Sequence, residues 1–172
     1  MGVIQAPDQD RIDRLDRMVR RYEKDLLRLC CVYLRDWNAA EDIVQDTFLK
    51  AYKNLDSFRG DSSEKTWLIR IALNGCRDYR RSTWFRYIDP RVSIDDLSVP
   101  SDMPSTAQAD ITLAIMKLKP KYMEAVLLYF YEGYSMREIG ELLGISEAAV
   151  SGRLQKARQK LKQTLEGGDL DE

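Results

Sequence analysis

The 172-residue chain has no histidine, only three cysteines and no long apolar run. Without histidine it lacks the commonest general base and the commonest metal ligand. Cys30, Cys31 and Cys76 form no CxxC pair, so we interpret them as small core residues, with a zinc site or a redox switch as the alternative. No phosphate-binding loop or nucleophile motif is present. We therefore expect a protein that is not an enzyme, with no catalytic residue, metal, cofactor or small-molecule substrate.

The lack of apolar runs and of net charge limits the location and the partners of the chain. No segment approaches the roughly 20 apolar residues of a membrane-spanning helix, and the first residues do not resemble a signal peptide. We therefore expect a cytoplasmic protein. The 27 basic and 28 acidic residues nearly cancel, whereas a protein that coats DNA is usually strongly basic. If this chain binds DNA, its basic residues must be clustered, and a partner can deliver it to its site.

Apolar residues at spacings of three and four indicate helices in the first half of the chain. A second helix is predicted to begin at Asn38, which with Glu41 resembles a capping signal. A loop is predicted at residues 56–65, and a third helix from about Thr66 to Trp84. The buried stripe predicted for the first helix comprises Ile12, Leu15, Val19, Tyr22, Leu26, Leu29 and Tyr33.

Prolines and aspartates gather in residues 86–107. Proline removes a backbone donor and disfavours helix in the residue before it. We therefore predict an extended acidic linker between a helical domain of residues 1–85 and a second one of residues 108–172. The predicted fold class is all-α, with two small helical domains and a helix-turn-helix in the second.

The second domain is predicted to begin with two helices that pack through apolar faces. Ile111, Ala114, Ile115 and Leu118 have helical spacing, and Pro120 suits the first turn of the next helix. Gly133 suits its C-terminal stop. The core face predicted between these two positions comprises Met123, Val126, Leu127 and Phe130.

Residues 135–162 have the pattern of a helix-turn-helix. Ser135 and Glu138 form a capping box, Gly144 suits a left-handed cap, and Ser146 can cap the second helix. Glycine inside a helix costs about 1 kcal/mol relative to alanine. We therefore expect Gly140 to allow a close approach of the second helix, where Ala149 is also small.

The second helix of this motif carries no acidic residue from Ala148 to Leu165. Arginine can pair with guanine edges and lysine with phosphates. A solvated basic face on an ordinary helical hairpin is the alternative, but the glycine turn and both caps favour duplex DNA binding. The candidate residues are Ser146, Ala149, Ser151, Arg153, Lys156 and Arg158.

Several motifs, in order from about Leu15 to Leu165, resemble the extracytoplasmic-function (ECF, group 4) family of bacterial RNA polymerase sigma factors. The run NAAEDIVQDTF from Asn38 resembles the family's polymerase-docking helix, and the helix-turn-helix resembles its C-terminal DNA-reading region. Four further pieces of sequence resemble the family's promoter-melting segment: Phe58-Arg59-Gly60, Thr66-Trp67-Leu68, Arg70-Ile71-Ala72 and Asn74. The resemblance implies a factor that binds core polymerase, recognises the minus-thirty-five and minus-ten elements and promotes DNA melting.

The resemblance also implies two further sets of site residues. An acidic patch with one apolar residue would dock on the clamp helices of the largest polymerase subunit, unless it is simply a solvated face; it comprises Glu41, Asp42, Gln45, Asp46 and Leu49. A ridge and loop would hold the unwound non-template strand, because cations suit phosphates and flat groups suit unpaired bases. These residues are Arg59, Gly60, Ser62, Ser63, Lys65, Trp67, Arg70, Asn74, Arg77 and Arg81. Trp67 can instead be a core residue.

Two positions depart from the family pattern. Many members carry aromatic residues just before the Thr-Trp pair, where this chain has Glu64 and Lys65. Serine often precedes the first arginine of the recognition helix, where this chain has Gly152. The resemblance implies that a flipped base is captured in the loop of residues 60–65. These departures leave the shape of that loop and the preferred minus-thirty-five sequence open.

The resemblance further implies a contact with the second-largest polymerase subunit and a linker that threads through the active-site cleft. It also implies an anti-sigma factor, often membrane-anchored, that would hold the chain at the inner face of the membrane. Two other functions remain open at this point. One is a stand-alone helix-turn-helix transcriptional regulator, and the other is a sigma-like adaptor without melting activity.

Overall fold

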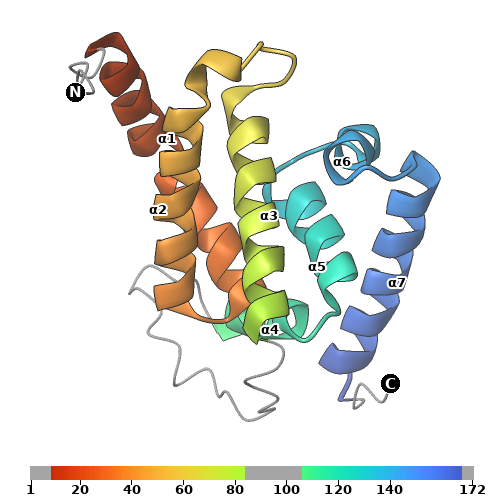
Figure 1. Ribbon diagram of the computed structural model, residues 1–172. Coiled ribbons are helices and arrows are strands. Elements are labelled where there is room, and N and C mark those ends of the chain that lie inside the picture. Colours follow the sequence, from red (N-terminus) through yellow and green to blue (C-terminus); the bar gives the residue numbers. More distant parts are fainter. Residues whose placement is uncertain (1–8, 84–105, 168–172) are drawn as a thin grey trace. The chain divides into compact units, whose positions relative to one another are not determined.

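The computed structural model describes residues 9–83 and 106–167, and every regular element among them is a helix (Figure 1). This confirms the predicted all-α fold class. The helices fall into two compact units, the first containing α1 to α3 and the second α4 to α7. The predicted end of the third helix at Trp84 lies outside the described residues. So does the predicted linker, except for its last two residues, which already belong to α4 because that helix begins at Thr106.

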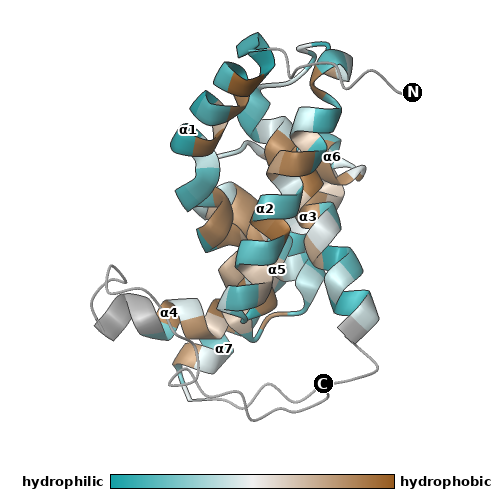
Figure 2. Ribbon diagram, turned by 60° about the vertical axis from the view of Figure 1, so that its left-hand side comes forward, coloured by the Kyte–Doolittle hydropathy of each residue, from teal (hydrophilic) through white to brown (hydrophobic). Residues whose placement is uncertain are grey.

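The first unit consists of α1 (Gln9–Leu34), α2 (Trp37–Lys53), the 3₁₀ turn η1 (Leu55–Ser57) and α3 (Glu64–Thr83). Helices α1 and α3 pack against each other. Figure 2 shows hydrophobic residues on one side of these helices and hydrophilic residues on the other. The three cysteines are free and buried, which confirms them as core residues. The largest fully buried side chains of this unit include Met18, Leu26, Tyr33, Leu68, Ile69 and Leu73.

Three local predictions for the first unit were wrong. The N-terminal end of the predicted stripe is not buried, since Ile12 is exposed while Leu26 and Leu29 are buried. Helix α2 begins at Trp37, so Asn38 lies inside its first turn and does not cap it. Helix α3 begins two residues early because the Ser63 hydroxyl accepts the backbone N–H of Thr66 at 3.1 Å, as a capping side chain does.

The second unit consists of α4 (Thr106–Met116), α5 (Pro120–Val126), the π turn η3 (Leu127–Tyr131), α6 (Met136–Leu143) and α7 (Glu147–Leu165). Helices α4, α5 and α6 all pack against α7. Pro120 occupies the first turn of α5, and Gly133 has a φ of 74° after η3, as predicted for a helix start and stop.

The π turn corrects the predicted core face of this unit. Met123, Val126 and Leu127 are buried, but the Phe130 side chain is 62% exposed. The backbone N–H of Glu132 bonds the carbonyl of Leu127, five residues earlier, at 3.0 Å. A π turn inserts one extra residue, so the helical periodicity used for the prediction fails there and Phe130 turns to the surface. Ile111 of α4 is also exposed, contrary to the prediction.

The helix-turn-helix has the predicted capping geometry. Both hydrogen bonds of the capping box between Ser135 and Glu138 are present, Gly144 has a φ of 69°, and Ser146 accepts the N–H of Ala149 at 3.1 Å. The close approach predicted at Gly140 is present, and it involves the turn and the very start of the second helix. A Cβ atom there would lie 2.7 Å from the carbonyl oxygen of Ile145 and 3.5 Å from the backbone nitrogen of Glu147, the first residue of α7, whereas Ala149 is exposed and takes no part.

Candidate nucleic-acid interface

The acidic patch lies on the outer face of α2. Glu41, Asp42, Gln45 and Asp46 are all exposed, and the buried residues of α2 occupy its other face. Leu49 is 57% exposed at the end of the same face and adds an apolar side chain to it. Asp46 pairs with Lys50 at 2.7 Å, whereas Asp42 makes no ion pair within the described residues. The structure therefore brings the five predicted docking residues together on one surface.

The predicted single-strand ridge lies on the outer face of α3. Arg70, Asn74 and Arg81 are exposed and point away from the buried residues Leu68, Ala72 and Cys76, while Trp67 and Arg77 are half-buried. Two of the cations are engaged along the helix, since Arg77 bonds Asn74 at 3.1 Å and Arg81 pairs with Asp78. Arg70 has no such partner among residues 9–83 and 106–167. It is therefore the most available cation of the ridge.

The loop before α3 brings only part of its predicted set to the surface. Arg59, Gly60 and Ser63 are exposed and Ser62 is half-buried. Gly60 has a φ of 77°, a left-handed conformation that strains other residues. Lys65 lies instead in the first turn of α3, where its ammonium group approaches Asp25 of α1 at 3.6 Å. Lys65, one of the ten residues predicted to bind single-stranded DNA, is thus turned toward α1 and away from the exposed loop residues.

The predicted duplex-reading residues divide between two sides of α7. Ala149, Lys156 and Gly152 are exposed, and Arg153 flanks them as a half-buried residue. Ser151 and Arg158 instead line an open groove of the second unit. Ser146 is occupied as the helix cap, so its hydroxyl already serves the start of α7. One face of α7 therefore holds Ala149, Arg153 and Lys156, without Ser151 or Arg158.

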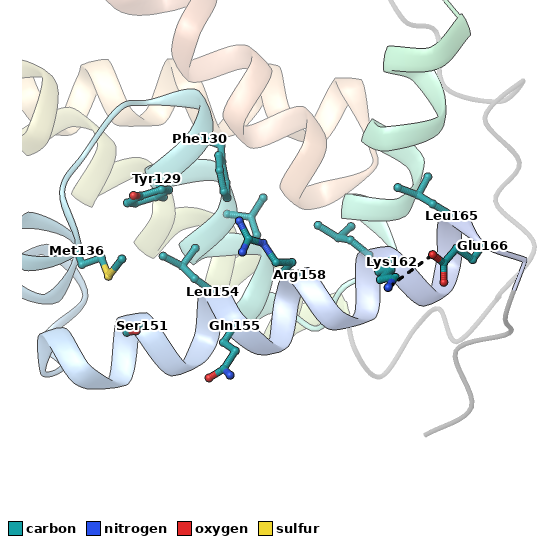
Figure 3. A pocket seen from close by; sticks show the side chains of 12 residues that line it. Tyr129, Phe130, Met136, Ser151, Leu154, Gln155, Arg158, Lys162, Leu165 and Glu166 are labelled. Carbon is teal, nitrogen blue, oxygen red and sulfur yellow. Dashed lines mark ion pairs between the residues drawn. The ribbon is translucent and has the colours of Figure 1, made fainter.

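The groove itself was not predicted from the sequence. Figure 3 shows Phe130 and Tyr129 on one side of it and the α7 residues Leu154 and Leu165 on the other. Arg158 extends toward Phe130, whereas Gln155 points away from the helix on another side (Figure 3). Leu165 is 52% exposed, like Phe130. The missed signal is a run of large apolar residues, Leu127 to Tyr131, too long for one buried helical face.

Few titratable groups among the described residues have a clearly shifted pKa. The pKa of Glu138 is lowered because the Ser135 backbone N–H and then the Ser135 hydroxyl donate to its carboxylate, at 2.8 and 2.7 Å. The pKa of the Cys30 thiol is raised by its hydrogen bond with Cys76 and by burial. No group of three or more metal-ligating side chains gathers within residues 9–83 and 106–167. Among those residues, no helix combines the length and apolarity needed to cross a membrane.

Comparisons with known families and relatives identify both units. Residues 18–86 match the family described as sigma-70 region 2, and residues 108–161 match sigma-70 region 4. The ECF RNA polymerase sigma factor SigM of Mycobacterium tuberculosis is 30% identical over 152 residues, which cover 87% of this chain and 76% of SigM. SigW of Bacillus subtilis, also an ECF sigma factor, is 31% identical over 167 residues, which cover 89% of each chain.

Solved structures have the same fold. The structure of CnrH in complex with the cytosolic domain of CnrY has a TM-score of 0.69 and 30% identity, and covers 94% of this chain and 100% of the CnrH chain. The sigma factor RpoE in complex with the anti-sigma factor NepR from Bartonella quintana has a TM-score of 0.74 and 24% identity, with 91% and 99% coverage. The second likeness concerns the fold alone.

These matches confirm the family and the function that the motifs indicated. Members of this family are RNA polymerase subunits that act in transcription initiation by binding, and they are not enzymes. The chain belongs to the ECF RNA polymerase sigma factors and carries their regions 2 and 4.

Proposed function

We propose that three surfaces of this sigma factor divide the work of initiation. The outer face of α2 docks on the clamp helices of the largest polymerase subunit. The α3 ridge and the Gly60 loop hold the unwound non-template strand of the minus-ten element, and α7 reads the minus-thirty-five duplex. The observation that carries the proposal is that α2, α3 and α7 each hold a cluster of the candidate residues outside their buried positions: Asp42 and its neighbours on α2, Arg70 and Asn74 on α3, and Ala149, Arg153 and Lys156 on α7. This arrangement also favours a sigma factor over a stand-alone regulator, which has no need of the region 2 surfaces.

The docking surface is best tested at Asp42. Asp46 pairs with Lys50, so a change there also disturbs α2, whereas Asp42 is exposed and has no ion pair within the described residues. Asp42→Arg should weaken the binding of core polymerase at least tenfold, because it places a cation in an interface that expects an anion. Glu23→Arg, on the outer face of α1, is the matched control. Equal binding by the wild type and Asp42→Arg would refute the docking role.

The single-strand ridge is best tested at Arg70. Arg70→Ala removes an exposed cation that supports no contact within the described residues, so folding should not change. A lost phosphate contact should slow promoter opening by holoenzyme, and this deficit should shrink at higher salt, because each contact contributes through counterion release and its loss reduces the salt dependence. Arg28→Ala, another exposed cation of the same unit, is the control. Identical opening by both variants would remove Arg70 from the ridge.

Arg153 tests the duplex-reading face of α7. If it reads a base edge, Arg153→Ala should weaken holoenzyme binding by about 1–3 kcal/mol on the preferred promoter and by much less on one altered at that base. An equal loss on every promoter would make Arg153 a phosphate contact. Lys117→Ala is the control, because Lys117 is exposed on the same unit but lies outside α7.

We also propose that the groove beside Phe130 receives an apolar segment of the second-largest polymerase subunit. The exposed Phe130 opposite the exposed Leu165 and the half-buried Leu154 supports a contact with apolar side chains. A photocrosslinking amino acid at position 130 should capture the second-largest subunit in holoenzyme. Position 131 is the control, because Tyr131 is equally exposed but does not line the groove. Capture of the largest subunit from position 130 would contradict the assignment.

We further infer that an anti-sigma factor controls this protein in the cytoplasm, where it meets polymerase. CnrH and RpoE, whose folds resemble this one, were each solved with a protein partner, and the partner of RpoE is the anti-sigma factor NepR. A product of a neighbouring gene should co-purify with the chain and be displaced by core polymerase. Simultaneous binding of both would argue against competition.

A further inference from the structure

The loop between α2 and α3 is held by two arginines of α1 that no family motif includes. Arg11 contacts the start of the segment and Arg14 contacts its end. Both residues lie more than 40 positions away in sequence from what they bind. Such contacts connect the N-terminal helix with the Gly60 loop, which we propose helps to hold the unwound non-template strand.

Arg11 fixes the entry of the segment. Its Nη2 donates to the carbonyl oxygen of Tyr52 at 2.8 Å, and its Nη1 lies 3.0 Å from an oxygen of Asp56. The guanidinium group also lies over the Tyr52 ring, 5.1 Å from its centroid. One side chain therefore holds the last turn of α2 and the 3₁₀ turn that follows it.

Arg14 fixes the end of the loop, next to α3, by an ion pair and by stacking on an aromatic ring. Its Nε donates to Glu64 Oε1 at 3.0 Å, and its guanidinium group lies 5.3 Å from the centroid of the Phe58 ring. The other neighbour of Phe58 is Trp67, with centroids 4.8 Å apart and planes tilted by 32°. A guanidinium group over an aromatic face is an attractive pair, so Arg14, Phe58 and Trp67 form one stack beside the loop.

Glu64 holds Arg14 of this stack in place through an ion pair, a contact that the family pattern did not suggest. The Arg14 and Glu64 side chains are only about one third exposed, at 34% and 32%, so their pair is less screened than one at the open surface. Glu64 is also the first residue of α3, where a carboxylate suits the helix dipole. Together with the Ser63 cap, the pair sets where the loop ends and α3 begins.

We propose that Arg14, supported by Arg11, is a positioning residue that fixes loop 58–63 and the face of Trp67 in the arrangement that captures one unpaired base of the non-template strand. This rests on the proposed function of the loop. Because Arg14 lies on α1 and the proposed ridge lies on α3, the N-terminal helix would set the base selectivity of strand capture without touching DNA.

The test uses holoenzyme and a promoter that the wild-type protein opens. Each non-template base of the opened segment is replaced in turn by an abasic site, and the opening rate is measured. In the wild type, one position should show a large loss. With Arg14→Ala, the intact promoter should open about tenfold more slowly, and the abasic site at that position should have little further effect. A merely destabilising change would slow all templates alike and leave this base dependence unchanged.

Three further variants make the result specific. Glu64→Gln should reduce the base dependence in part, because Arg14 keeps its stacking on Phe58 but loses the ion pair. Arg14→Lys should also fail to restore it fully, because an ammonium group cannot form the planar contact. Arg17→Ala, an exposed arginine of α1 with no partner among the described residues, should behave as the wild type.

The outcomes separate the inference from the proposed function. A strong base dependence that persists in Arg14→Ala and Glu64→Gln would overturn the positioning role while leaving strand capture by the loop intact. A wild-type holoenzyme that opens the promoter with no dependence on any single base would overturn both.

Discussion

Gly140 and Gly152 provide a pair of substitutions with opposite expected signs. Both lie inside helices, so alanine should gain about 1 kcal/mol at either position from helix propensity alone. A Cβ atom at Gly152 would meet nothing within 4 Å, whereas one at Gly140 would lie 2.7 Å from the carbonyl oxygen of Ile145. Gly152→Ala should therefore stabilise the second unit by about 1 kcal/mol, about fivefold in its unfolding equilibrium constant.

At Gly140 the contact decides the sign. The Ile145 carbonyl belongs to the tight turn, whose N–H bonds the Gly140 carbonyl at 3.0 Å, so it cannot shift freely. Overpacking of this kind costs about 1–3 kcal/mol, which leaves a net loss of up to about 2 kcal/mol after the gain in propensity. The two glycines thus predict a difference between the variants that does not depend on the absolute stability of the protein.

Amide hydrogen exchange measures both effects within the second unit. The amides of Ile145 and Val150 bond the carbonyls of Gly140 and Ser146, so their protection reports the opening of the turn and of α7. Protection should rise in Gly152→Ala and fall in Gly140→Ala. Higher protection in Gly140→Ala than in the wild type would refute the packing explanation.

Gly152→Ala has a functional consequence as well. Because no neighbour in the free protein requires glycine at this exposed position, we expect it to allow the backbone of α7 to approach duplex DNA closely. The more stable variant should therefore bind a minus-thirty-five duplex more weakly as holoenzyme. Equal or tighter binding would mean that the glycine has no function in DNA reading.

Three other predictions concern single residues. Gly60→Ala should slow promoter opening although its Cβ meets no atom, because a φ of 77° costs about 1–2 kcal/mol for an L residue; an unchanged opening rate would contradict this. The lowered pKa of Glu138 means that its capping box stabilises the fold above about pH 4.3, the ordinary glutamate value, and that this stabilisation is lost as the pH falls through the lower folded pKa. The Ser135 amide shift in NMR spectra should titrate below that ordinary value, and a midpoint at or above it would argue against the box. Burial and the raised pKa of Cys30 should keep all three cysteines unmodified by maleimide in the native protein, with three adducts by mass spectrometry in urea; rapid native labelling would show that the core opens.

Local signals explain the parts of the fold that the sequence predicted well. The capping box at Ser135 and the left-handed Gly144 depend only on residues a few positions apart, so their chemistry can be recognised without a structure. The exposed faces of α2 and α3 follow from helical periodicity in the same way. The site residues on these faces remain predictions until the binding experiments are done.

The features that the sequence did not reveal depend on a change of register or on distant contacts. The π turn at Leu127–Tyr131 shifts the periodicity by one residue and exposes Phe130, and the long apolar run there is also compatible with an ordinary buried helix. Arg14 meets Glu64 across 50 positions, which a search for local motifs does not test. The division of α7 between Arg153 and Arg158 depends on where α5 packs, because that neighbour creates the groove.

Promoter opening by reconstituted holoenzyme distinguishes a sigma factor from a stand-alone regulator and from an adaptor. The protein is mixed with core polymerase and promoter fragments of the cognate genome, and thymines that react with permanganate are mapped together with the transcripts. We predict reactive thymines in the minus-ten region only when both the protein and core polymerase are present, and transcripts that start just downstream. Polymerase binding without reactive thymines on any fragment would contradict the account and indicate an adaptor without melting activity.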